Sequence, residues 1–141
     1  MKSVIKSLFA IFLLSITFSA CQKKNNDMAK SLDGQWEITK ITKGNGVVDE
    51  SSMPEKISLI SCNVRKEDCS GVWVSKKGDL NNFFWTISEK GELLTIMTED
   101  SQVFNQASSD LAEYKGIYVI VEIRDNKMVI NRDNITMEFK K

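Results

Sequence analysis

The sequence of 141 residues contains no histidine, a single proline and only three cysteines. Without histidine, the Ser-His and Cys-His pairs that activate nucleophiles cannot form, and no imidazole is present to bind a metal. Adjacent carboxylates such as Asp49-Glu50 and Glu99-Asp100 do not replace them, because neighbouring residues of a strand point to opposite faces. We therefore expect a protein that is not an enzyme and uses no metal or other cofactor.

The sequence also has no excess charge of one sign, since 19 Lys and Arg residues balance 19 Asp and Glu residues. Removal of residues 1–20 takes away Lys2 and Lys6 and no acidic residue, which leaves 17 basic against 19 acidic residues and a net charge of about −2. Such a balance offers no basic surface for phosphates. We therefore expect no nucleic-acid partner.

Residues 1–20 have the layout of a secretory signal, with two lysines before an apolar run from Leu8 to Phe18. That run is too short for a permanent membrane-spanning helix. The tetrad Phe18-Ser19-Ala20-Cys21 resembles the lipobox of bacterial lipoproteins. The resemblance implies cleavage before Cys21 and acylation of its thiol, for example with palmitate. The alternative is an ordinary secretory signal, which would leave a lone thiol in an oxidising compartment.

Residue 22 is Gln rather than Asp, which is typical of outer-membrane lipoproteins in enterobacteria. We therefore expect the protein in the cell envelope, attached to the outer membrane through lipid on Cys21. Residues 22–30 (QKKNNDMAK) contain no aromatic or β-branched residue. We accordingly expect residues 21–30 to be a flexible tether.

Residues 31–141 have the length of one domain with one core. Apolar residues recur there with period two, as in strands whose alternate side chains face a core. The clearest run is 117–124, whose odd-numbered positions form one strongly apolar face. Similar runs occur at 35–42, 56–61, 71–75, 83–88, 93–98, 128–131 and 135–140. Turn-forming groups separate them, so the pattern predicts an all-β antiparallel meander of about eight strands, closed as a barrel or folded as a sandwich.

The segment Leu32-Asp33-Gly34-Gln35-Trp36 at the start of this domain resembles the Gly-x-Trp opening of lipocalins. It is more similar still to the lipocalin-like lipoproteins of Bacteroidetes. The resemblance implies a small up-and-down β-barrel in which Gly34 permits a tight turn into the first strand and Trp36 packs across the closed end. In larger lipocalins a late arginine also stacks on that tryptophan, and Arg124 and Arg132 are the candidates for this role here.

Cys62 and Cys69 are an even pair flanking a loop in an exported protein, which predicts a disulfide. Closing a loop of this size stabilises a fold by roughly 2 to 3 kcal/mol in the chain-entropy model. A metal or redox pair is the alternative. However, the spacing is not C-x-x-C and matches no zinc pattern.

The aromatic residues leave two interpretations open: a filled core, or the lining of an apolar pocket. The candidate ligand-binding residues are Trp36, Trp73, Phe83 and Trp85. The leading hypothesis is a lipid-anchored, lipocalin-like protein that binds a small hydrophobic or amphipathic molecule. The competing hypothesis is a non-catalytic accessory protein that docks a membrane or envelope partner through an outer aromatic face containing Phe84, with no particular protein partner indicated.

Overall fold

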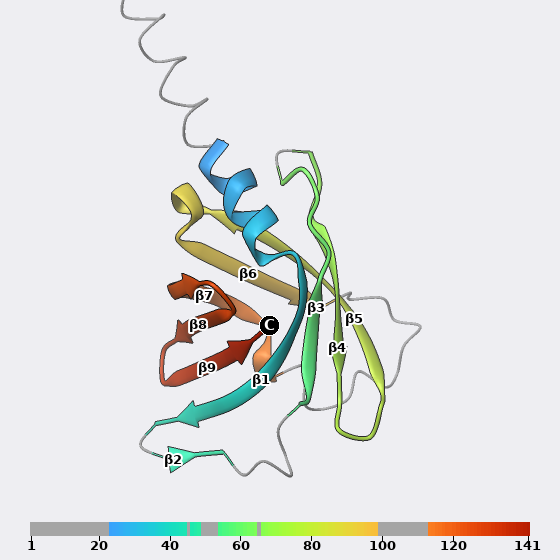
Figure 1. Ribbon diagram of the computed structural model, residues 1–141, viewed down its shortest axis with the longest axis vertical. Coiled ribbons are helices and arrows are strands. Elements are labelled where there is room, and N and C mark those ends of the chain that lie inside the picture. The colour runs from blue at the N-terminus through green and yellow to red at the C-terminus, as the bar shows by residue number, and fades with distance from the viewer. Residues whose placement is uncertain (1–22, 45, 49–53, 65, 99–112) are drawn as a thin grey trace, which may run out of the picture.

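The computed structural model describes residues 23–44, 46–48, 54–64, 66–98 and 113–141. The expected signal segment, residues 1–20, and the expected lipid-bearing Cys21 lie outside the described residues. The strands form one antiparallel sheet in the order β2-β1-β3-β4-β5-β6-β7-β8-β9, and β1 also pairs with β9 (Figure 1). The sheet therefore closes into an eight-stranded barrel, with β2 as a short extra strand beside β1. The predicted all-β barrel is confirmed, and the sandwich alternative is not formed.

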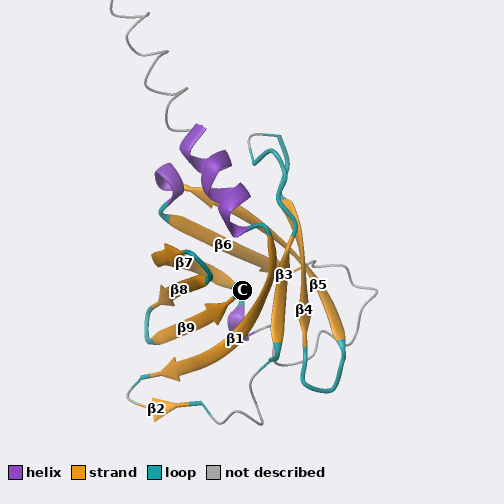
Figure 2. Cartoon of the chain, in the orientation of Figure 1, coloured by secondary structure: helices purple, strands orange, loops and turns teal. Residues whose placement is uncertain are grey.

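The strands follow one another around the barrel in chain order, which is the up-and-down arrangement that short turns produce. Their bounds are β1 Gly34–Lys43, β2 Gly46–Val47, β3 Lys56–Leu59, β4 Cys69–Val74, β5 Leu80–Ser88, β6 Leu93–Thr98, β7 Gly116–Arg124, β8 Lys127–Arg132 and β9 Ile135–Lys140. A 3-10 turn, η2, spans Glu89–Gly91 between β5 and β6 (Figure 2). Closure of β1 onto β9 leaves the wall without a free edge between them, which protects against edge-to-edge association.

Residues 23–32 form a helix over one end of the barrel, where we had expected a flexible tether (Figures 1 and 2). Ala29 and Leu32 are fully buried, and Met28 packs against the core. These three positions share one helix face, so the short apolar stripe gains its stability by packing on the barrel. The tether prediction is therefore wrong for residues 23–30. It relied on polar composition and overlooked this stripe.

Strand β7 also differs from the sequence prediction, because its strongly apolar face points outward. Its exposed side chains are Ile117 (58%), Val119 (50%) and Val121 (62%). Tyr118 is fully buried instead. A β-bulge between Ile120 and Glu122, opposite β8, then shifts the alternation, and Ile123 packs against the core. Period two located the strand correctly, but it could not tell which side faced inward.

Candidate functional site

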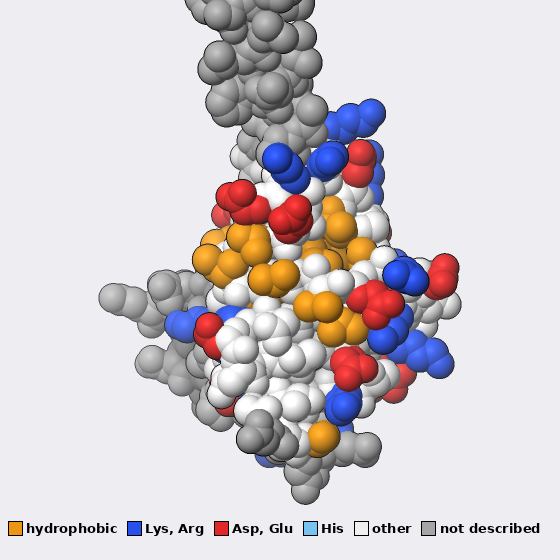
Figure 3. Space-filling model, turned by 90° about the vertical axis from the view of Figure 1, so that its left-hand side faces the viewer, with side chains coloured by type: hydrophobic (Ala, Val, Ile, Leu, Met, Phe, Trp, Pro, Cys, Tyr) orange, Lys and Arg blue, Asp and Glu red, His pale blue; other side chains and the backbone are white. Residues whose placement is uncertain are grey.

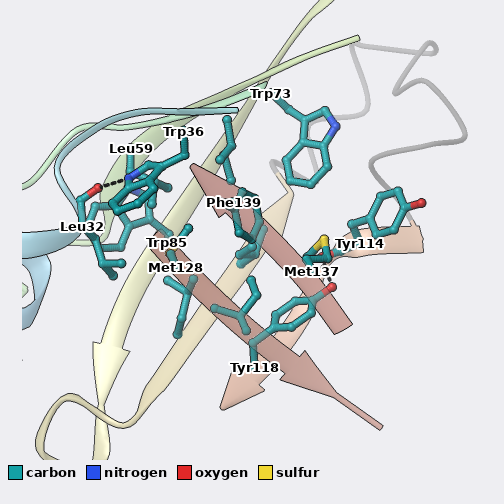
Figure 4. Close-up of a cluster of buried hydrophobic side chains, with 14 of the residues drawn as sticks. Leu32, Trp36, Leu59, Trp73, Trp85, Tyr114, Tyr118, Met128, Met137 and Phe139 are labelled. Atoms are coloured by element: carbon teal, nitrogen blue, oxygen red, sulfur yellow. Dashed lines mark hydrogen bonds between the residues drawn. The ribbon is translucent and has the colours of Figure 1, made fainter. Parts of the chain in front are cut away.

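Trp36 lies at the barrel end that the helix covers. Its ring is 1% exposed, and its Nε1–H donates a hydrogen bond of 2.7 Å to the Leu32 carbonyl at the end of the helix (Figure 4). The Lys141 Nζ lies 4.8 Å from the centre of the ring. The cation that packs on this tryptophan is therefore Lys141, and the expectation of Arg124 or Arg132 was wrong. The last strand ends beside the first, which brings the C-terminal residue to Trp36.

Gly34 occupies a position that disfavours any other residue. Its φ of +117° lies in the region that L side chains rarely adopt. A Cβ on Gly34 would also approach the Lys141 Cε to 3.0 Å. Both observations agree with the tight turn into β1 that the Gly-x-Trp resemblance implied.

Trp85 belongs to the same end of the core as Trp36 (Figure 4). It is fully buried, and its Nε1–H donates a hydrogen bond of 2.8 Å to the Ser70 carbonyl on the neighbouring strand β4. Both indoles at the helix end thus have their polar atom satisfied by backbone. Buried tryptophans usually have their indole N–H bonded to an acceptor in this way.

The opposite end of the barrel carries a second group of aromatic rings. Trp73 stacks on Tyr114 with ring centres 5.5 Å apart and meets Phe83 edge-on at 6.4 Å. Gly71, which pairs with Phe83 across the sheet, leaves room for that ring, because a Cβ there would lie 2.3 Å from it. We call the group of Trp73, Asn81, Phe83 and Tyr114 the aromatic end.

Two N–H groups at the aromatic end are buried without a hydrogen-bond acceptor: Nε1 of Trp73 and Nδ2 of Asn81. Trp73 and Asn81 are paired across β4 and β5, and Asn81 shares the inward-facing alternation of Phe83. A buried donor left unpaired costs roughly 1 to 3 kcal/mol, and folded proteins contain few of them. The aromatic end therefore offers two donors that an incoming acceptor can satisfy.

Lys43 and Arg132, two cations with partners around Tyr114, are already engaged. Lys43 pairs with the Glu113 carboxylate, and its Nζ lies 5.1 Å from the centre of the Tyr114 ring. Burial lowers the pKa of Lys43, but hydrogen bonds and charge interactions with Glu113 and Tyr114 outweigh it, so the pKa is raised overall. Arg132 donates to the Glu113 carbonyl at 2.8 Å and also to the Lys115 carbonyl.

Tyr118 is fully buried inside the barrel, on the same side as Tyr114 (Figure 4). Its hydroxyl donates a hydrogen bond of 2.8 Å to the Tyr114 carbonyl, and the Arg132 guanidinium lies 5.0 Å from its ring centre. Burial raises the pKa of Tyr118 to about 12, although Arg132 opposes the shift. The tyrosine therefore stays protonated at neutral pH and acts as a hydrogen-bond donor within the fold.

The structure separates the four candidate ligand-binding residues into two pairs. Trp36 and Trp85 belong to the helix end, whereas Trp73 lies at the other end (Figure 4). Phe83 belongs with Trp73 to the aromatic end, because the two rings meet edge-on. All four are at most 1% exposed. Sequence reasoning missed Asn81, although the alternation along β5 places it on the face of Phe83. It also missed the stacking role of Tyr114, which precedes β7 and carries no periodic signal.

An open groove of about 460 Å³ lies elsewhere, on the outside of the barrel. Its lining residues are Thr39, Glu122, Arg124, Asp125, Asn126, Lys127, Phe139 and Lys140. None of the four candidate ligand-binding residues lines it. Within the described ranges, no three His, Cys, Asp or Glu side chains are grouped to hold a metal ion. The described helices are also too short or too polar to cross a membrane.

The structure contains the predicted disulfide between Cys62 and Cys69, whose Cα atoms are 5.2 Å apart. The loop that it closes is tied to the helix end of the barrel. The Asn26 side chain accepts a hydrogen bond from the Val64 N–H, and the Asp33 carboxylate accepts one from the Ser61 N–H. The disulfide therefore holds the loop that braces the helix.

Comparison with known proteins supports the architecture and nothing finer. No family model and no curated protein match the sequence. A solved structure of a lipocalin-like protein from Bacteroides uniformis matches with a TM-score of 0.53 at 18% identity, covering 79% of this chain and 98% of that chain. The fold is lipocalin-like. An uncharacterised protein from Bacteroides eggerthii matches this lipocalin-like barrel with a TM-score of 0.51, also at 18% identity, over 78% of this chain and 98% of that chain.

Proposed function

We propose that this lipocalin-like protein is a lipid-anchored component of the cell envelope that binds a small hydrophobic or amphipathic molecule in its barrel. One observation carries the binding proposal: the two ends of the barrel differ in whether their buried side-chain N–H groups have hydrogen-bond acceptors. The helix end is covered, and both of its indole N–H groups are bonded to backbone. The aromatic end keeps two buried donors without acceptors. Binding sites for small molecules combine an apolar lining with a few placed polar groups in this manner.

The anchoring part of the proposal rests on the lipobox-like tetrad before Cys21. This cysteine is two positions before Lys23, the first described residue of the helix that packs on the barrel. Two or three acyl chains give a stable anchor, because each buried methylene contributes about 0.8 kcal/mol. Mass spectrometry of the mature protein is expected to show acylation at residue 21. A Cys21→Ser protein released from the membrane fraction supports the anchor, and a mature protein without acyl mass contradicts it.

The binding part is tested with the mature chain carrying Cys21→Ser, which leaves every described residue unchanged. This protein is incubated with a lipid extract of the envelope and examined by native mass spectrometry. We expect an added mass of one small molecule per chain. Protein that remains empty across extracts contradicts ligand binding.

A second candidate function is docking on the membrane, for which the outer face of β5 to β7 is the specific observation. Phe84 is 37% exposed there and pairs with Met97, while Val119 pairs with Leu93 on the same outer face. Figure 3 shows hydrophobic side chains gathered on one side of the barrel, with acidic and basic side chains around them. Because the expected anchor is so close to the helix, the membrane is the partner that can reach this face. Val119 is 50% exposed on this face.

An environment-sensitive fluorophore distinguishes this second candidate. The lipidated protein in phospholipid vesicles is labelled at Val119→Cys, and a control is labelled at Ser58→Cys on the outer face of β3. A blue shift confined to the label at residue 119 supports docking. Equal spectra at both positions contradict it, and a shift that depends on protein concentration indicates association of copies instead.

A further inference from the structure

We infer that the aromatic end recognises an uncharged carbonyl group on an apolar ligand, through the Trp73 Nε1–H and an Asn81 Nδ2–H. The inference deepens the proposed binding function and rests on it. It assigns the ligand a chemical class, an ester, amide or ketone carried by an apolar body, and it assigns two residues that select this class.

The three tryptophans of the barrel differ in how their indole N–H groups are bonded. Trp36 and Trp85 each donate from Nε1 to a backbone carbonyl, at 2.7 and 2.8 Å. Trp73 is equally buried, at 1% exposure, yet its Nε1 has no acceptor. Figure 4 shows this nitrogen on the ring edge that faces away from Trp36 and Trp85. The indole N–H of Trp73 is therefore the one of the three that is left for a partner outside the fold.

Asn81 provides a second donor beside Trp73, because the two residues are cross-strand partners. Directly paired residues on one face of an antiparallel sheet have Cβ atoms about 5 Å apart. The Nδ2 of Asn81 is buried and has no acceptor either. A carbonyl oxygen has two lone pairs, so one oxygen between the two side chains can accept from both donors.

The charged groups around Trp73 and Asn81 favour a ligand whose head group is neutral. Both donors are uncharged. Lys43 is paired with Glu113, and Arg132 is bonded to two backbone carbonyls. A ligand carboxylate buried here would find no unengaged cation among these residues, and burying an unpaired charge is far more costly than burying a carbonyl. The apolar part of the ligand would then lie against Phe83 and Tyr114.

Three naphthalene probes separate these chemical classes in the mature chain carrying Cys21→Ser. They are 2-dimethylamino-6-propionylnaphthalene, an uncharged ketone; 2-dimethylaminonaphthalene, which lacks the carbonyl; and anilinonaphthalene sulfonate, an anion. Fluorescence titration gives the Kd of each. We expect the ketone to bind roughly tenfold or more tightly than the compound without the carbonyl, since it satisfies two donors. We expect the anion to bind more weakly than the ketone.

Variants then test the two donors. Trp73→Phe keeps an aromatic ring and removes the N–H, and Asn81→Leu removes the amide. We expect either change to weaken ketone binding by roughly fivefold to tenfold and to leave the Kd of the compound without the carbonyl nearly unchanged. Without ligand, Trp73→Phe is expected to lower the Tm less than Trp85→Phe does, because both changes shrink a buried ring but only Trp85 gives up a formed hydrogen bond. The matched control Trp85→Phe loses a formed hydrogen bond, so its Tm should fall while its ketone Kd stays the same.

The possible failures are distinguishable. If none of the probes binds the unmodified barrel, the proposed binding function and this inference both fall. If the ketone binds equally well to Trp73→Phe and Asn81→Leu, the barrel binds ligands but the assignment of the head group is wrong. If Asn81→Leu lowers the Tm as much as Trp85→Phe does, the amide already partners Trp73 within the fold, which also overturns the inference.

Discussion

Tyr118 shows how a single buried side chain sets the pH range of stability. Burial raises its pKa to about 12 in the folded protein, against about 10 in an unfolded chain. The folded state therefore keeps a proton that the unfolded state has lost between these values. The contribution of Tyr118 is fully present below pH 10 and is lost as the pH rises from about 10 to about 12, by at most about 2 to 3 kcal/mol.

We therefore expect Tyr118→Phe to flatten the dependence of the unfolding free energy on pH between pH 9 and 11.5. Urea unfolding at several pH values measures it. Lys43 acts in the same direction, because its pKa is also raised. Lys43→Gln is therefore the control that separates the two groups. Parallel pH curves for the wild type and Tyr118→Phe would contradict this assignment.

Some residue roles could be predicted from the sequence and others could not. Gly34 and Trp36 were identified because a local motif carries both the backbone requirement and the packing partner. Lys141 was missed, because its position over Trp36 depends on the pairing of β9 with β1, which joins the two ends of the domain. Asn81 was missed for a similar reason, since an unpaired donor is defined by what surrounds it in space.

The helix of residues 23–32 is the element that covers one end of the barrel. Leu32 is fully buried at its last turn. Replacing a buried leucine with alanine costs about 2 to 5 kcal/mol, because apolar contact is lost and a cavity remains. We expect Leu32→Ala to lower the unfolding free energy within this range, measured by chemical denaturation. Lys30→Ala, an exposed change on the same helix, should leave the free energy within about 0.5 kcal/mol of the wild type. Equal effects of the two changes would show that the helix does not pack as described.

The disulfide between Cys62 and Cys69 braces the loop that contacts the helix through Val64 and Asn26. The pair of substitutions Cys62→Ser and Cys69→Ser should lower the unfolding free energy by about 2 to 3 kcal/mol through the regained freedom of the unfolded chain. Denaturation with and without reductant checks the result. Reductant should destabilise the wild type and leave the double variant unaffected, and a reductant effect on the variant would point to another cause.

Strand β7 marks the limit of period-two reasoning for a single element. Its even-numbered face also carries two large apolar or aromatic residues, Tyr118 and Ile120, so alternation alone does not assign the buried side. The aromatic Tyr118 faces inward and a bulge changes the alternation after Ile120. Sequence patterns locate such a strand, whereas its neighbours in the sheet decide its orientation.

At the scale of the whole molecule, the barrel has apolar side chains on both its inner and its outer surface. Ile117 and Val119 are at least 50% exposed, whereas Ile130 on β8 is fully buried. We expect the joint change Ile117→Thr and Val119→Thr to alter the unfolding free energy by less than about 1 kcal/mol and to raise solubility. Ile130→Thr should cost more than about 2 kcal/mol, because it buries a hydroxyl and removes core contacts. Equal losses, measured by urea unfolding, would show that the outer residues are part of the core.

The sequence by itself determined the all-β class, the eight strands of the barrel wall without the short β2, the disulfide, and the glycine and tryptophan that begin the barrel. Each of these depends on residues close together in the chain. The tertiary structure decided which face of β7 is buried, which cation packs on Trp36, and that residues 23–32 form a helix. It also decided that the neighbouring Trp73 Nε1 and Asn81 Nδ2 are buried without hydrogen-bond acceptors. These features arise only when the sheet closes and brings distant residues together, because burial and pairing are properties of the neighbours in space.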